Sequence, residues 1–182
     1  LYGDILPVPE SRVTEIEDNE EIVVGGRKFT ILHTAGHARH HICIFDHNSN
    51  SVFTGDTFGI AYPDLQIGSR KFIYPATTPS DFDIAAARES ITRIGNLNPG
   101  RIWLTHFGAW DDVHDGAAQL HHALDSIESI QQEAVASALT GEELKNFCYE
   151  KMRHFIVNEL ELRNLRLSNE QWKIFDYDVK LN

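Results

Sequence analysis

The chain has 182 residues, of which 42% are apolar and 24% charged, and its formal net charge is −11. This length fits one domain with a substantial core, and the composition excludes a disordered chain, a collagen-like repeat and a disulfide-stapled miniprotein. Nucleic-acid partners are not expected, because phosphate contacts need clustered Lys and Arg. No membrane partner is expected either, since no apolar run approaches the ~20 residues that span a bilayer.

The cysteines and the start of the chain bear on its cellular setting. Cys43 and Cys148 lie in apolar surroundings without a Cys-x-x-Cys pair, so we expect reduced core thiols in a cytoplasmic protein. No basic segment followed by an apolar run opens the chain, so no secretory signal is predicted. The first residue is Leu1 rather than Met, which indicates a processed start or a piece of a longer protein.

The first part of the chain reads as short strands joined by tight turns. Apolar and polar residues alternate there, which is typical of strands with one buried face. Gly25-Gly26 separates two such runs by two residues and predicts a β-hairpin. The strands, of antiparallel style, are expected at residues 21–24, 27–33, 41–46 and 51–54.

The middle of the chain changes character. Residues 59–79 show no periodicity and hold three of the six prolines, so we expect a long loop, which in a compact domain is usually functional or mobile. Ser80 is expected to cap a helix whose buried stripe reaches Ile94 and which ends at Gly95. One more short strand is expected at residues 101–105.

The last part reads as helical. Apolar residues at helical spacing predict one helix over 116–139. Thr140 with Glu143 predicts a capping box at the start of the next helix, which extends to about Leu160 and forms a hairpin with the first. One short helix is expected in 168–182.

Three of the expected strands end in a side chain that can bind a metal ion. His37, Asp56 and His106 each follow a strand, and each has a glycine beside it or two positions away that allows a sharp turn. Imidazole and carboxylate together suit Zn, Fe or Mn. If the strand ends meet at one rim of a sheet, these three residues form a metal site.

The ordered set of these segments resembles the third, fourth and fifth metal-binding motifs of the metallo-beta-lactamase fold hydrolases. The segments are TAGHARHH (34–41), FTGDT (53–57) and LTHFG (104–108), preceded by GGRKF (25–29). The resemblance covers roughly residues 10–110. It implies an α/β fold: half of an αββα sandwich over 1–112, extended by a C-terminal helical hairpin over 113–182 that packs on the same core.

The resemblance also implies roles for individual residues. His37 matches a ligand of the first metal, Asp56 a ligand that bridges both metals, and His106 a ligand of the second. His41 matches a position that supports the site from behind the ligands. Ala35 stands where the family usually has proline, which is a minor departure.

A larger departure is the absence of the family signature His-x-His-x-Asp-His, which supplies the other four ligands. In the family it lies in the first half of the fold, upstream of where this chain begins. We therefore expect the chain to be the C-terminal half of a longer hydrolase, with a degenerate homologue as the alternative. Alone, it is expected to be inactive and to bind at most one metal ion, weakly.

The activity implied for the complete site is hydrolysis of an ester, thioester, lactone or amide. In the family two ions share a hydroxide that attacks the carbonyl carbon, and Asp56 would hold the ions at a fixed separation. Residues that could contact a small-molecule substrate are His40, beside the first motif, and Tyr62, Lys71 and Tyr74 in the long loop.

Two other functions stay open at this point. The same fold and ligands serve iron-dependent redox proteins, such as flavodiiron-like oxygen-binding proteins and persulfide dioxygenases. The chain could also be a scaffold or assembly module without activity. If the first half is missing, a bare apolar sheet face favours a homo-oligomer or association with that missing half.

Overall fold

The computed structural model describes residues 6–77 and 81–181. It holds a six-stranded mixed sheet in the order β1-β2-β3-β4-β7-β8. The first four strands pair antiparallel in sequence order, β7 pairs parallel with β4, and β8 pairs antiparallel with β7. The strands are β1 (Glu21–Val24), β2 (Arg27–His33), β3 (Ile42–Asp46), β4 (Ser51–Gly55), β7 (Arg101–Leu104) and β8 (Gly108–Trp110).

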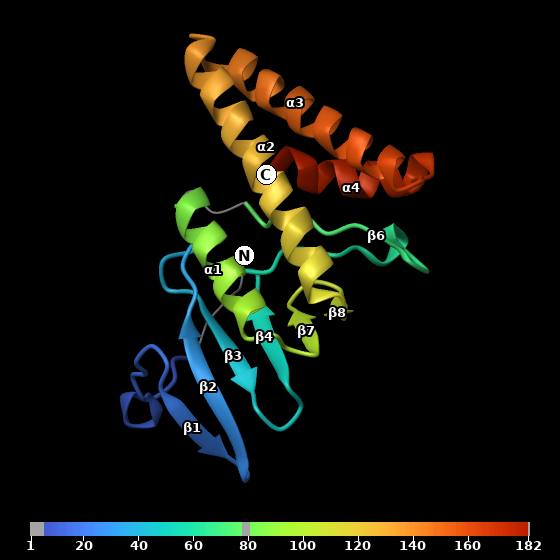
Figure 1. Cartoon of the computed structure of the whole chain (residues 1–182). Helices are drawn as coiled ribbons and strands as arrows, with labels where there is room; N and C mark the ends of the chain where they lie inside the picture. Colours follow the sequence, from blue (N-terminus) through green and yellow to red (C-terminus); the bar gives the residue numbers. More distant parts are fainter. Residues whose placement is uncertain (1–5, 78–80, 182) are drawn as a thin grey trace.

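Four α-helices accompany the sheet: α1 (Ile84–Asn96), α2 (Val113–Ala136), α3 (Gly141–Leu162) and α4 (Asn169–Leu181). Figure 1 shows α1 beside the strands, and α2 leading away from β8 toward α3 and α4, at the end opposite the β1–β2 hairpin. None of the helices in the described ranges is long and apolar enough to cross a membrane. The fold is therefore mixed α/β with a helical C-terminal part, as expected.

One face of the sheet is covered by α1 and α2. Alternate residues of the central strands point to this face, as the two-residue repeat of a strand requires. They are fully buried against apolar stripes of the two helices. This core includes Leu32, Cys43, Val52 and Ile102 from the sheet, Ile91 and Ile94 from α1, and Leu120 and Leu124 from α2.

The opposite face of the sheet is apolar and partly open. The strand register aligns Ile44, Phe53 and Trp103 in one row across three neighbouring strands. The rings of Phe53 and Trp103 stack with centroids 6.3 Å apart, and Phe53 is 45% exposed. Ile42, nearer the end of β3, is 41% exposed.

A second core joins the segment between β4 and α1 to the C-terminal helices. This segment contains a 3-10 turn (Pro63–Leu65) and the short strands β5 (Gln66–Ile67) and β6 (Arg70–Lys71), so the expectation of a stretch without long regular elements is confirmed. The segment is only partly exposed, however. Its buried side chains Leu65, Phe72 and Tyr74 pack against Met152 and Ile156 of α3 and Phe175 of α4.

The helix boundaries differ in part from the expected ones. Ser80 lies outside the described residues, and Asp83 occupies the N-cap of α1, where its carboxylate accepts a hydrogen bond from the Ala86 amide at 3.0 Å. The helix continues to Asn96, so the prediction that Gly95 ends it is wrong by one residue. Beyond Gly95 the Leu97 and Asn98 amides close the helix end on the Ile94 and Gly95 carbonyls, at 3.2 and 3.0 Å.

The two long helices also start differently. The α2 helix begins at Val113 instead of residue 116, because Asp112 caps it through the Asp115 amide at 3.0 Å. Thr140 does stand at the N-cap of α3, but its side chain makes no capping hydrogen bond, so the predicted capping box is wrong. Gly141, the first residue of α3, has φ of 56°, which turns the first amides away from a regular helix start.

Candidate metal centre

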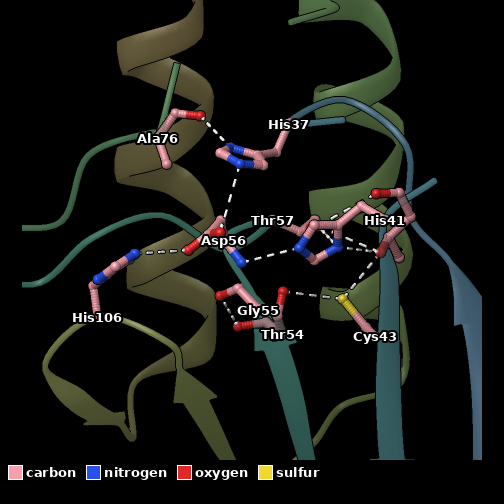
Figure 2. Close-up of polar contacts among 10 residues, drawn as sticks. His37, His41, Cys43, Thr54, Gly55, Asp56, Thr57, Ala76 and His106 are labelled. Carbon is pink, nitrogen blue, oxygen red and sulfur yellow. Dashed lines mark hydrogen bonds and ion pairs between the residues drawn. The ribbon is translucent and has the colours of Figure 1, made fainter. Parts of the chain in front are cut away.

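The three glycine-flanked strand ends meet at one edge of the sheet. The strands β2, β4 and β7 all run in the same direction, because β2 and β4 are each antiparallel to β3 and β7 is parallel to β4. Their carboxyl ends therefore lie together. His37 follows β2, Asp56 follows β4 and His106 follows β7, and Figure 2 shows Asp56 between the two imidazoles.

Each imidazole faces a different oxygen of Asp56. The Nε2 atom of His37 lies 3.5 Å from Oδ2, and the Nε2 atom of His106 lies 3.1 Å from Oδ1. The carboxylate is one-quarter exposed, and the His106 side chain is half exposed. The residues thus form two nitrogen–oxygen pairs that share one carboxylate.

The orientation of His37 is set by a backbone carbonyl. The Nδ1 atom of His37 lies 2.8 Å from the carbonyl oxygen of Ala76 (Figure 2). A carbonyl can only accept, so Nδ1 carries the proton and donates it. The Nε2 atom then points toward the Asp56 carboxylate, the orientation that a metal-binding imidazole requires.

The Asp56 carboxylate lacks the partners that a buried oxygen normally has. Within the part of the chain that the structure describes, its Oδ1 is buried without a hydrogen-bond partner, because His106 is close but not aligned for one. Its Oδ2 lies 3.5 Å from Nε2 of His37. Unpaired buried oxygens are costly and call for an explanation. A cation beside the carboxylate would satisfy both oxygens, so these residues fit a metal.

The donors do not surround a single point. No group of three or more His, Cys, Asp or Glu side chains in residues 6–77 and 81–181 is arranged to hold one ion. The pairs instead offer one nitrogen and one oxygen in two adjacent places, with Asp56 common to both. Such a set can bind a divalent ion only weakly unless further ligands are added.

Figure 2 shows His41 across Asp56 from His106, and its ring centroid lies 5.7 Å from that of His37. Its Nε2 accepts the backbone amide of Asp56 at 3.1 Å, so its Nδ1 must carry the proton that it shares with Thr57 Oγ1 at 2.9 Å. Burial, followed by the nearby His37, lowers the pKa of His41 and favours this neutral form. His41 thereby holds the backbone that presents the carboxylate.

Two glycines are needed for this geometry. Gly36 has φ of 133°, and a Cβ atom there would lie 2.4 Å from the backbone of Ala87 in α1. Gly55 has φ of 52°, and a Cβ atom there would lie 2.5 Å from Nε2 of His41. Both positions exclude a side chain, and each lies directly before a proposed ligand.

The residues expected to contact substrate occupy different environments. His40 is exposed, and Lys71 is half-buried with its ammonium over the ring of Trp110. Tyr62 is half-buried, with its ring centroid 6.4 Å from that of Tyr74. Tyr74 is buried beneath it, and its hydroxyl has no hydrogen-bond partner among the described residues. Burial raises the pKa of Tyr74 well above its usual range, so it stays protonated.

The sequence reasoning missed three groups at or near the site. Phe107 is 49% exposed, contacts Tyr62 with ring centroids 4.5 Å apart and adopts φ of 75°, which is rare outside glycine. The Ala76 carbonyl has no side-chain signal that could have revealed it. Gln119 did give a signal, because it is a polar residue beside the apolar stripe of α2.

The two cysteines are free, as expected, and should differ in reactivity. The thiol of Cys43 is buried, contacts Thr34 Oγ1 at 3.1 Å, and has its pKa raised by burial to about 11. Cys148 is only half-buried. Iodoacetamide at pH 8 should therefore modify Cys148 but not Cys43 in the folded chain, and both in urea. Mass spectrometry of the peptides checks this, and rapid native modification of Cys43 would contradict it.

Comparison with known proteins gives a consistent result. The model of the metallo-beta-lactamase superfamily matches residues 2–106. A metallo-beta-lactamase fold-containing protein of Sulfurisphaera tokodaii, ST1585, is 32% identical over 109 residues, which are 59% of this chain and 38% of that protein. The crystal structure of ST1585 aligns with a TM-score of 0.49 at 28% identity, over 64% of this chain and 40% of the other.

A beta-lactamase domain protein from Burkholderia ambifaria aligns with a TM-score of 0.52 at 19% identity, over 71% of this chain and 38% of the other, a likeness of fold alone. The chain spans less than half the length of each of these relatives. The match to the family model covers more than half of the 182 residues, and with it the three strand ends that carry His37, Asp56 and His106. The chain belongs to the metallo-beta-lactamase superfamily.

Proposed function

We propose that the chain supplies part of the dinuclear metal site of a hydrolase that cleaves an ester, thioester, lactone or similar carbonyl bond. One observation carries the proposal: the Asp56 carboxylate lies between two imidazole nitrogens and has a buried oxygen without a hydrogen-bond partner. His37 would bind the first ion, His106 the second, and Asp56 both. Zn is the ion we expect, with Fe or Mn as alternatives that the same donors accept.

When bound, such ions lower the pKa of a water molecule and stabilise negative charge on the carbonyl oxygen. The chain's own residues keep the ligands in place. The Ala76 carbonyl keeps the proton of His37 on Nδ1, so that Nε2 is free to bind. His41 fixes the Asp56 backbone.

Metal binding is tested first. Isothermal titration of the chain with Zn²⁺ and with Fe²⁺ should show one weakly bound ion, because each nitrogen–oxygen pair is incomplete. Replacing both His37 and His106 with Ala should remove this binding, whereas His154→Ala on α3, outside the site, should leave it unchanged as the matched control. Equal loss in both variants, or no binding at all, would count against the site, and tight binding of two ions would contradict the incomplete ligand set.

The reaction is tested on the longest natural protein that contains this sequence. Hydrolysis of a series of thioesters, esters and lactones should depend on added Zn²⁺ and disappear after treatment with a chelator. His37→Ala should abolish it. Iron in the purified protein, with visible absorbance and oxygen consumption in place of hydrolysis, would favour the iron-dependent redox alternative. Unchanged function in His37→Ala would favour a scaffold role.

We also propose that the open sheet face is covered in solution, by a second copy or by another part of the protein. Phe53 and Ile42 on this face are 45% and 41% exposed, and Val24 on the edge strand is 59% exposed. Exposed apolar patches of this kind favour association. Light scattering should show a dimer or larger species that Phe53→Glu reduces, and a monodisperse monomer at high concentration would contradict this.

A further inference from the structure

A buried glutamine of α2 is joined to the segment that orients His37. Gln119 is only 7% exposed, although it is polar and lies next to the buried Leu120 on α2. Its Oε1 accepts the backbone amide of Ile73 at 3.2 Å. Its Nε2 donates to the Lys71 carbonyl at 3.3 Å and to the Asp115 carboxylate at 2.7 Å. The Asp115 carboxylate can only accept a hydrogen bond, so it must face the NH2 group of Gln119. This leaves the Oε1 atom directed at the Ile73 amide.

The segment that Gln119 holds continues directly to the site. Tyr74 forms a two-way bridge with Ile60, in which each amide donates to the other's carbonyl, at 2.8 and 3.3 Å. Two residues later the Ala76 carbonyl accepts the Nδ1 proton of His37 at 2.8 Å. Gln119 is therefore attached to the backbone three residues before the group that fixes the His37 tautomer.

The segment has little regular structure of its own to hold this position. The strands β5 and β6 are two residues long and pair only with each other, and the Ile60–Tyr74 bridge is isolated. A side-chain amide that binds both an amide and a carbonyl of the backbone replaces the missing strand partner. The buried position and the three hydrogen bonds of Gln119 favour this role over simple filling of space.

We propose that Gln119, oriented by Asp115, is a positioning residue for the metal ligand His37. It holds the segment from Lys71 to Ala76, so that the Ala76 carbonyl keeps the His37 proton on Nδ1 and directs Nε2 toward Asp56. That His37 is a metal ligand rests on the proposed function. The hydrogen bonds from Asp115 to Gln119, and from Gln119 to the segment, do not depend on a metal.

The test uses Gln119→Met, which removes the amide and nearly keeps the volume. Long-range proton–nitrogen NMR of the histidine rings, on the metal-free 182-residue chain at one fixed pH, reads which nitrogen of His37 is protonated. The wild type should show Nδ1 protonation, and the variant a mixture of tautomers. The affinity for Zn²⁺ should fall about 10- to 100-fold. An unchanged His37 signal in the folded variant would overturn the proposal.

Asp46→Asn is the matched control. Asp46 is also buried and hydrogen-bonded, to Arg27 and Ser49, but lies at the other end of the sheet. This variant should lose thermal stability and keep both the His37 signal and the Zn²⁺ affinity. If it changes the His37 signal as much as Gln119→Met does, the effect is general destabilisation and the proposal fails.

Gln119→Glu keeps the test usable if Gln119→Met does not fold. The change keeps an acceptor for the Ile73 amide but leaves the Lys71 carbonyl without its donor. A folded Gln119→Glu chain should show mixed His37 tautomers, and the wild-type signal in it would overturn the proposal. The two claims can fail separately, because the NMR measurement needs no metal. Absence of Zn²⁺ binding in the wild type would refute the proposed function, and the His37 tautomer would still decide the role of Gln119.

Discussion

Replacing Asp56 with Asn should abolish metal binding while leaving the metal-free chain as stable as the wild type, or more stable. The affinity for Zn²⁺ is expected to fall by about 100-fold or more, since the change removes a charge and one of two ligand oxygens. The free energy of unfolding should stay the same or rise by up to about 1 kcal/mol. A residue that only supported the fold would lose stability instead.

The reason lies in the contacts of the carboxylate. One oxygen is buried without a hydrogen-bond partner, and the other lies 3.5 Å from Nε2 of His37. An asparagine amide could donate to that nitrogen, and it carries no charge that needs compensation. In the metal-free protein, Asp56 therefore stabilises the folded state less than asparagine would. Such a cost in stability is typical of residues kept for function.

Two measurements decide the outcome: isothermal titration with Zn²⁺, and urea unfolding of the metal-free protein. Asp46→Asn is again the matched control, because it removes the charge of a well-paired aspartate. It should lose stability and retain Zn²⁺ affinity, which is the opposite pattern. If Asp56→Asn loses stability and binds Zn²⁺ like the wild type, Asp56 is a structural residue and the proposed metal site is wrong.

The residues at the strand ends could be predicted from the sequence, because the signals there are local. A glycine at a strand end, followed by His or Asp, marks both the turn and the chemical group, and His37, Asp56 and His106 do lie together in the structure. The hairpin at Gly25-Gly26 is confirmed for the same reason: Val24 pairs with Arg27 across a two-residue turn. Where one residue type has few conformations or few roles, the sequence alone is informative.

Other features depend on contacts between distant segments and leave no local trace. The strand β7 pairs parallel with β4 across a connection that includes α1, and β8 is only three residues long, so neither the pairing nor β8 was foreseen. The partner of His37 is a backbone carbonyl, which any residue at position 76 would offer. The capping hydrogen bond predicted for the Thr140 side chain is absent. Gly141, the next residue, takes a left-handed conformation that the sequence pattern of a capping box does not reveal.

Replacing Gly36 with Ala should cause the largest loss of stability of the changes considered. At φ of 133° an alanine is strained, and its Cβ would lie 2.4 Å from the Cα of Ala87, a backbone atom that cannot move alone. The turn and the helix are also bonded to each other: the Asp83 amide donates to the Gly36 carbonyl at 2.9 Å, and Ser90 Oγ donates to the Ala35 carbonyl at 2.6 Å. We expect a loss on the order of 3 kcal/mol.

Gly25→Ala separates the two causes of this loss. Gly25 also has a positive φ, of 59°, but a Cβ there would meet nothing within 4 Å, so only backbone strain of about 1 kcal/mol is expected. Urea unfolding of both variants measures the difference. If they lose equal stability, the close approach of α1 to the turn is not what requires Gly36. If Gly36→Ala loses more, as expected, the glycine before His37 sets how closely α1 docks on the turn that presents this ligand.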